Sequence, residues 1–121
     1  METMAKAVTP RAAIEYQDEE GVVPFRAWLL SLRDVRAKVK ITKAITQMEA
    51  GNFSDHKSIA DSGGLYERRI DYGPGYRIYY IKEGDELIII FAGSDKSDQQ
   101  KAIDNAKRYL KDYKRRKKVS E

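Results

Sequence analysis

The chain has 121 residues and a formal net charge of +4, and this length predicts one domain with a single hydrophobic core. It contains no cysteine and one histidine, His56, which excludes a disulfide framework, a cysteine nucleophile and any site that needs two imidazoles. No apolar run is as long as a signal peptide or a membrane span, so we expect a soluble cytoplasmic protein that does not bind membranes.

The basic residues are concentrated near the C-terminus. Residues 107–121 hold eight Lys or Arg against two acids, whereas residues 1–106 carry a net charge of −2. Such a patch suits a polyanion, because Lys and Arg neutralise phosphates whatever the base sequence. A solvated helix end is the alternative interpretation. The candidate contacts are Lys107, Arg108, Lys111, Lys114, Arg115 and Arg116.

Three segments are predicted: a flexible N-terminus over residues 1–12, one domain over residues 13–113, and a basic tail over residues 114–121. Ala12–Tyr16 is short and ends at an acidic, turn-prone segment, which predicts a first or edge strand. Pro24 suits the first turn of a helix, and the apolar residues after it recur at helical spacing. We expect this helix to bury its tryptophan as a core anchor. Its apolar residues are Phe25, Trp28, Leu29 and Leu32.

A second helix is predicted from Asp34, which can cap it, to about Ala50, with Gly51 as its stop. The short link between the two helices favours an antiparallel hairpin packed on one face of a sheet. Residues 51–64 are polar and predict a loop that carries His56 and Lys57 toward the sheet. The predicted apolar stripe of the second helix is Val35, Val39, Ile41, Ile45 and Met48.

Three consecutive antiparallel strands are predicted between residues 65 and 91, because turn sequences at 72–75 and 83–85 separate β-rich runs. Alternation places Glu67 and Arg69 on one face of the first strand, and Arg77 and Tyr79 on one face of the second. The third strand is apolar on both faces, which is typical of a central strand.

A final helix is predicted after a capping box formed by Ser97 and Gln100. Ile103, Ala106, Leu110 and Tyr113 should face the core. The element order is then β-α-α-β-β-β-α. We expect an α+β domain with a small curved antiparallel sheet, an N-terminal helical hairpin and a C-terminal helix.

Two arginines on neighbouring predicted strands form a candidate anion-binding site. Arg69 and Arg77 lie on adjacent strands and can face the same way, which is costly unless an anion lies between them or Glu67 compensates. A phosphate matches paired guanidiniums, and Lys96 beyond the last strand can add a third cation. The alternative is that Arg69 and Lys96 form surface ion pairs with neighbouring acids.

The sequence shows no carboxylate cluster for two metals and no glycine-rich nucleotide loop, since a strand and not a helix follows residues 73–75. We therefore expect neither a metal nor a cofactor. Phosphodiester cleavage without metal restricts the substrate to RNA, whose 2′-hydroxyl can serve as the nucleophile.

Residues 64–100, GLYERRIDYGPGYRIYYIKEGDELIIIFAGSDKSDQQ, closely resemble the core of the RelE/ParE superfamily of type II toxin–antitoxin toxins. Three motifs in order carry the resemblance, LYExR, YGPGYRIYY and GSDKSxQ, and it extends from about Ile14 to Tyr113. The branch concerned comprises HigB-like and phage Gp49-like addiction module killer proteins. Membership implies a curved antiparallel sheet flanked by helices.

The resemblance implies two activities. RelE and HigB relatives are ribosome-dependent mRNA interferases, endoribonucleases that cut translated mRNA through its 2′-hydroxyl without metal and so arrest growth. ParE relatives inhibit DNA gyrase without being enzymes. The set Arg69, Arg77 and Lys96 favours the ribonuclease. The implied partners are the ribosome, mRNA and a cognate helix-turn-helix, HigA-like antitoxin in a hetero-oligomer.

By position, Arg77 matches the family's strand arginine that contacts the scissile phosphate. Arg69 stands at a basic position on the preceding strand, and Lys96 stands near a basic residue after the last strand. HigB relatives use residues in the loop before the sheet, which keeps His56 and Lys57 as candidates. The general base is open. Further candidates for catalysis or RNA binding are Glu67, Tyr79, Tyr109 and Tyr113.

Overall fold

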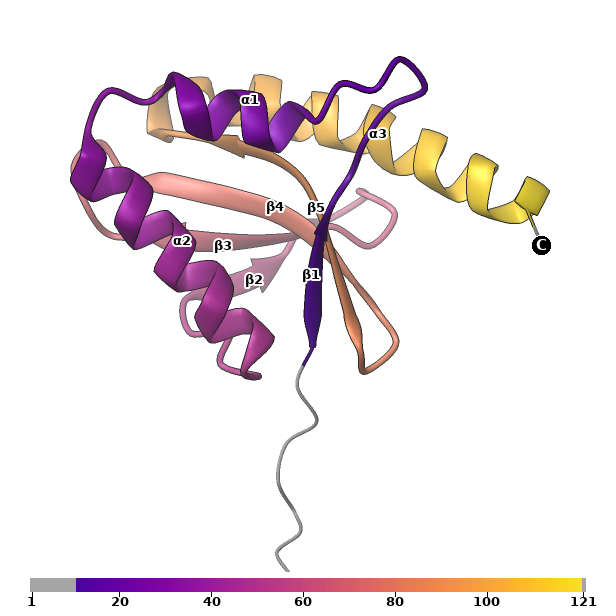
Figure 1. The fold of residues 1–121 in the computed structure, drawn as a ribbon, viewed down its shortest axis with the longest axis horizontal. Helices are drawn as coiled ribbons and strands as arrows, with labels where there is room; N and C mark the ends of the chain where they lie inside the picture. The colour runs from indigo at the N-terminus through magenta and orange to yellow at the C-terminus, as the bar shows by residue number, and fades with distance from the viewer. Residues whose placement is uncertain (1–10, 121) are drawn as a thin grey trace, which may run out of the picture.

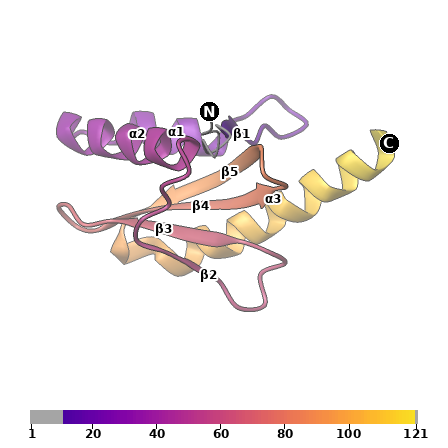
Figure 2. The ribbon, with the colours of Figure 1, turned by 90° about the horizontal axis from the view of Figure 1, so that it is seen from below.

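The computed structural model describes residues 11–120 and shows a sheet between two layers of helix (Figure 1). Figure 2 shows α1 and α2 on one face of the sheet and α3 on the other. The strands are β1 (Ala12–Glu15), β2 (His56–Ser58), β3 (Tyr66–Ile70), β4 (Tyr76–Glu83) and β5 (Leu87–Ser94). The helices are α1 (Pro24–Ser31), α2 (Val35–Glu49), the short 3-10 helix Lys96–Asp98 and α3 (Gln99–Ser120).

The α+β class is confirmed, with two corrections to the predicted sheet. The strand order is β1-β5-β4-β3-β2, and β1 pairs parallel with β5, so the sheet is mixed and not wholly antiparallel. In addition, residues 56–58 form an edge strand that pairs with β3 where a loop was predicted. Most of the predicted N-terminal segment, residues 1–10, lies outside the described residues.

Alternation along the strands creates a separate core on each face of the sheet. On one face, α1 and α2 pack against strand residues that include Ile78, Tyr80 and Ile90. On the other, α3 packs against residues that include Tyr79 and Phe91. Strand β5 is buried on both faces, as predicted for a central strand.

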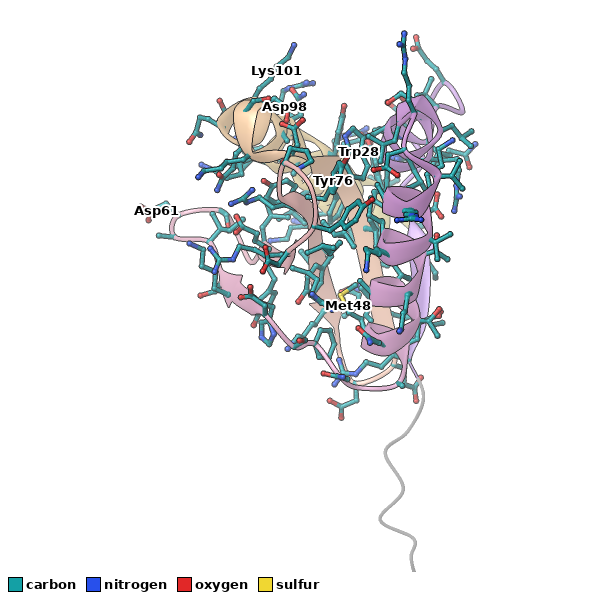
Figure 3. The ribbon with its side chains drawn as sticks, turned by 90° about the vertical axis from the view of Figure 1, so that its left-hand side faces the viewer. Trp28, Met48, Asp61, Tyr76, Asp98 and Lys101 are labelled. Carbon is teal, nitrogen blue, oxygen red and sulfur yellow. The ribbon has the colours of Figure 1, made fainter. Side chains whose placement is uncertain are left out.

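Helix α1 begins at Pro24 and buries Phe25 and Leu29. Trp28 packs against the core as predicted, and Figure 3 shows it between α1 and the sheet. A Cβ at Gly93 of β5 would lie 2.2 Å from Trp28 Cε3, so the indole occupies space that only glycine leaves free. The tryptophan thus fixes how closely α1 approaches the sheet.

Helix α2 is capped by Asp34 as predicted, since its side chain accepts hydrogen bonds from the backbone of Arg36 and Ala37. The predicted apolar stripe was partly wrong, because Val35 and Val39 are exposed. The small alanines were not counted as apolar, yet they complete a stripe at helical spacing on the opposite side. The buried residues are Ala37, Ile41, Ala44 and Met48.

Helix α3 directs Ile103, Ala106 and Leu110 into the core as predicted. Its approach differs from the prediction, because Asp95 and Asp98 form the capping box in place of Ser97 and Gln100. Residues 114–120 continue the helix, so the basic segment is no separate tail. Among residues 11–120, no helix has the length and apolarity required to cross a bilayer.

Candidate functional site

Six polar side chains share the α3 face of the sheet near the start of α3. Residues directly opposite each other on paired strands point to the same face. Their registers give two rows, one joining Lys57, Glu67 and Tyr79 and the next joining Arg69, Arg77 and Ser94. We call this set the polar patch. Its members are Lys57, Glu67, Arg69, Arg77, Tyr79 and Ser94.

Arg77 is held in the patch by a buried ion pair. Its Nε lies 3.5 Å from Glu67 Oε2, an ion-pair distance, and the Glu67 side chain is only 1% exposed. Arg77 Nη1 donates a hydrogen bond to the Gly75 carbonyl at 3.0 Å, and Gln99 Nε2 donates to Glu67 Oε1 at 3.3 Å. Glu67 therefore compensates the charge of Arg77 and fixes its position, one of the two alternatives that the sequence left open.

Arg69 lies directly opposite Arg77 but is half-exposed. Its Nε is 3.3 Å from Asp55 Oδ2, so this arginine also has a carboxylate partner. Both arginines line a pocket of about 330 Å³ at the end of the β3–β4 hairpin, together with Asp55 and Asp71. An oxyanion entering the pocket would meet two guanidiniums, and it would compete with Asp55 for Arg69.

Tyr79 is fully buried behind the arginines, and its hydroxyl is 2.9 Å from Ser94 Oγ. Burial raises the pKa of Tyr79 to about 12. The phenol therefore stays protonated at neutral pH, which suits a hydrogen-bond donor and not a general base.

The structure separates other candidates from the arginine pair. Lys96 is exposed on the 3-10 helix and does not line the arginine pocket. His56 is the register partner of Arg68, whose guanidinium contacts Gln47 of α2, so His56 lies on the opposite face of the sheet. Lys57, beside it, is on the patch face.

Two tyrosines on α3 serve packing far from the arginines. Tyr109 stacks on Tyr16 with ring centroids 5.2 Å apart. Tyr113 packs its edge against Phe91 and donates a hydrogen bond to Glu83 at 3.3 Å, and burial raises its pKa. At about 1.5 Å per residue, Tyr113 lies roughly 20 Å along the helix from Gln99. The structure brings neither tyrosine to the patch.

The basic residues of α3 divide into two sides. Arg115 and Arg116 both form ion pairs with Asp112, and Arg115 also pairs with Glu19. On the other side, lysines follow each other at helical spacing, and one of them, Lys114, donates to the Gly63 carbonyl at 2.8 Å. This lysine side has more charge available for a polyanion. Its members are Lys107, Lys111 and Lys114. Arg108 bonds to Asn105.

Sequence reasoning missed the partners of the candidate residues. Asp55 and Gln99 are remote in sequence from the arginines, and only strand register and helix docking bring them close. Ser94 gave one signal, a polar residue closing an apolar strand. Among residues 11–120, no group of three or more His, Cys, Asp or Glu side chains is arranged to hold a metal ion.

Comparison with known proteins finds a relative of this chain in Haemophilus influenzae. No family model matches the chain. An uncharacterized protein of Haemophilus influenzae is 46% identical over 83 residues, which cover 69% of this chain and 82% of that protein. The chain therefore belongs to the same family as this uncharacterized Haemophilus influenzae protein.

Proposed function

We propose that this protein is the toxin of a type II toxin–antitoxin module and cuts translated mRNA on the ribosome without a metal ion. The observation that carries the proposal is the pair Arg69 and Arg77, which lie directly opposite each other on β3 and β4 and line one pocket. The resemblance of residues 64–100 to RelE/ParE toxins supplies the reaction.

In the proposed reaction, the 2′-hydroxyl oxygen of one nucleotide attacks the adjacent phosphorus and the P–O5′ bond breaks. The products are a 2′,3′-cyclic phosphate and a 5′-hydroxyl. Negative charge grows on the phosphate oxygens, and donors held in place beforehand stabilise it most. Glu67 holds Arg77 in position, and Arg69 exchanges Asp55 for the phosphate. The 2′-hydroxyl loses one proton and the departing O5′ gains one, and Lys57, in the adjoining row, is our candidate for this proton transfer.

The lysine side of α3 is the proposed contact with ribosomal RNA. It lies beside the loop between β2 and β3, on the same face of the sheet as the polar patch. A cognate antitoxin of the helix-turn-helix type would inhibit the protein by covering this basic face with acidic or apolar segments. The complex would be a hetero-oligomer in the cytoplasm.

A reconstituted translation reaction with a defined mRNA tests the proposal. We expect wild-type protein to cut the mRNA only when ribosomes translate it. Arg69→Gln removes the exposed cation and should lower the cleavage rate about a hundredfold. Arg77→Lys keeps a charge beside Glu67 but loses the planar fork, so it should act similarly. The matched control, Lys43→Gln, changes the same charge on the exposed side of α2 and should cut normally. Intact mRNA with wild-type protein would contradict the proposal.

A second candidate function is non-enzymatic inhibition of DNA gyrase. One observation favours it: Arg69 and Arg77 each have a carboxylate partner, as expected if they hold the fold together and not a substrate. A supercoiling assay distinguishes the two functions. Loss of supercoiling with wild-type protein, together with intact translated mRNA, would select gyrase.

A further inference from the structure

A second group of cations lies on the other face of the sheet, against α2. Arg68 of β3 and Lys82 of β4 point to this face, and Arg11 reaches it from the start of β1. Aromatic rings lie among them. We call this group the cation–aromatic cluster. Its members are Arg11, Phe53, Tyr66, Arg68, Tyr80 and Lys82.

The rings bring the cations together. Lys82 Nζ lies 4.2 Å from the centroid of Phe53 and 4.8 Å from that of Tyr66. Arg11 Cζ lies 5.1 Å from the same Phe53 ring. Phe53 and Tyr66 both stack on Tyr80, with centroids 5.9 and 5.6 Å apart. Such contacts hold cations in place without neutralising them.

Neighbouring acids form no ion pair with these cations within residues 11–120, although the charge of Asp55 partly opposes the effect of burial on the pKa of Arg68. Asp55 forms its ion pair with Arg69 on the patch face, and a Glu49 carboxylate oxygen accepts a hydrogen bond from the Ala13 backbone. Within residues 11–120, Arg11, Arg68 and Lys82 form no ion pair. Burial lowers the pKa of Arg68, and burial followed by the charge of Arg11 lowers the pKa of Lys82.

The cluster contains buried hydrogen-bond donors that have no partner. Arg68 is only 7% exposed and its Nε has no hydrogen-bond partner, and the hydroxyl of the fully buried Tyr80 also has none. Arg11 Nη1 is a third buried, unpartnered donor. Burial raises the pKa of Tyr80, while the charges of Arg68 and Arg11 oppose that shift. Buried donors without acceptors are rare and point to a missing acceptor.

We propose that the cation–aromatic cluster is a phosphate-binding site, distinct from the Arg69–Arg77 pocket. Three cations and a buried hydroxyl donor would be matched by an anion that has several oxygens and more than one negative charge. A phosphate dianion has both, whereas one carboxylate would leave most of the charge unbalanced. The side chains of Arg11, Tyr66 and Lys82 are half-buried, so each is partly accessible from solvent.

This site does not depend on the proposed nuclease, because it uses different residues on the opposite face of the sheet. Arg69→Gln should therefore lower the rate of mRNA cleavage about a hundredfold and leave phosphate binding at the cation–aromatic cluster unchanged. Failure of one proposal would leave the other standing.

NMR titration of the full-length, isotopically labelled protein with inorganic phosphate tests the site, with sodium chloride adjusted to hold ionic strength constant. We expect saturable shifts of the Arg68 and Lys82 backbone amides. Arg11→Gln and Lys82→Met should each weaken the affinity about tenfold or more, because each removes a charged donor. Lys82→Met keeps an unbranched side chain over Phe53, so the fold should persist. Lys43→Gln is the control of equal charge and should bind normally.

A parallel titration with adenosine monophosphate identifies the source of the phosphate. Tighter binding than inorganic phosphate would indicate a nucleotide whose base stacks on the rim, and equal binding would indicate free phosphate. Shifts confined to the Arg69–Arg77 pocket would overturn the proposal. Equal weakening by Lys43→Gln and Lys82→Met would also overturn it, because the anion would then follow net charge alone.

Discussion

The polar patch and the cation–aromatic cluster occupy opposite faces of the same two strands. They differ in whether their cations have carboxylate partners. In the patch, Arg69 and Arg77 each have a carboxylate partner. In the cluster, Lys82 lies over the Phe53 and Tyr66 rings, and within residues 11–120 neither Lys82 nor Arg68 forms an ion pair. A carboxylate partner fixes the direction of an arginine side chain, whereas a cation without an ion pair keeps its charge for an incoming anion.

Glu67→Ala should have the largest effect on stability. It leaves Arg77 buried beside the sheet without its counter-ion, which costs about 3 kcal/mol of unfolding free energy. Urea denaturation measures the change. Asp55→Ala is the matched control, because it removes the partner of the half-exposed Arg69 and should cost less than about 1 kcal/mol. Equal costs would show that burial does not distinguish the two pairs.

Replacing the adjacent tyrosines by phenylalanine should have the next largest effect on stability. Tyr79 lies on the face of the polar patch and Tyr80 on the face of the cation–aromatic cluster. Tyr79→Phe leaves the fully buried Ser94 hydroxyl unpaired and should cost about 1–2 kcal/mol. Tyr80→Phe removes a hydroxyl that has no partner and should cost nothing. Urea denaturation compares the two variants. A larger destabilisation by Tyr80→Phe would contradict the assignment of its hydroxyl as unpaired.

Alkaline pH tests the same tyrosines. Burial raises the pKa of Tyr79 from 10.0 to about 12 and raises that of Tyr80 in the same direction. A folded-state pKa above the unfolded value contributes stability that is complete below the unfolded pKa and is lost as pH rises through the folded one. The unfolding free energy should therefore fall between pH 10 and 12. Tyr79→Phe should reduce this fall in unfolding free energy. The same fall in the variant and in the wild-type protein would contradict the raised pKa of Tyr79.

Lys82→Met should have a small effect in phosphate-free buffer. The variant no longer has the cation–π interactions with Phe53 and Tyr66, but it also relieves repulsion from Arg11, and these terms nearly cancel. We expect the unfolding free energy to change by less than about 1 kcal/mol. Thermal denaturation without and with phosphate makes the comparison. A destabilisation as large as that of Glu67→Ala would mean that the cluster is structural.

Substitutions on the two sides of α3 should affect the folded protein least and should instead change its affinity for RNA. Lys107→Gln with Lys111→Gln removes two cations from the lysine side. RNA affinity should weaken, and its salt slope should fall by roughly 0.7 for each phosphate that the protein no longer neutralises. Arg115→Gln with Arg116→Gln removes cations already paired with Asp112 and should change the slope less. Filter binding over a salt series measures both. Equal salt slopes for the two double variants would show that the basic end of α3 is a solvated helix end and not an RNA contact.

The sequence predicted the elements that depend on local periodicity. The long strands, the cap at Asp34 and the core face of α3 were correct because each is encoded in neighbouring residues. Strand β2 was missed because three residues show no alternation, and its pairing with β3 depends on the partner. The parallel pairing of β1 with β5 was missed because no tight turn joins them.

The candidate site was only half predictable for a similar reason. Alternation placed Arg69 and Arg77 on one face, and the register confirmed it. The partners of these arginines come from packing between remote segments, which leaves no mark in sequence. The same limit hid the displacement of His56 to the opposite face, since a loop residue has no predictable side.

We propose that this protein cuts translated mRNA through the Arg69–Arg77 pair. The most direct test of this proposal is to map mRNA 5′ ends in cells after brief induction of the wild-type protein or of Arg69→Gln. We expect new 5′-hydroxyl ends inside translated frames with the wild-type protein, and few with the variant. Growth arrest without new 5′ ends, or identical ends with both proteins, would contradict it.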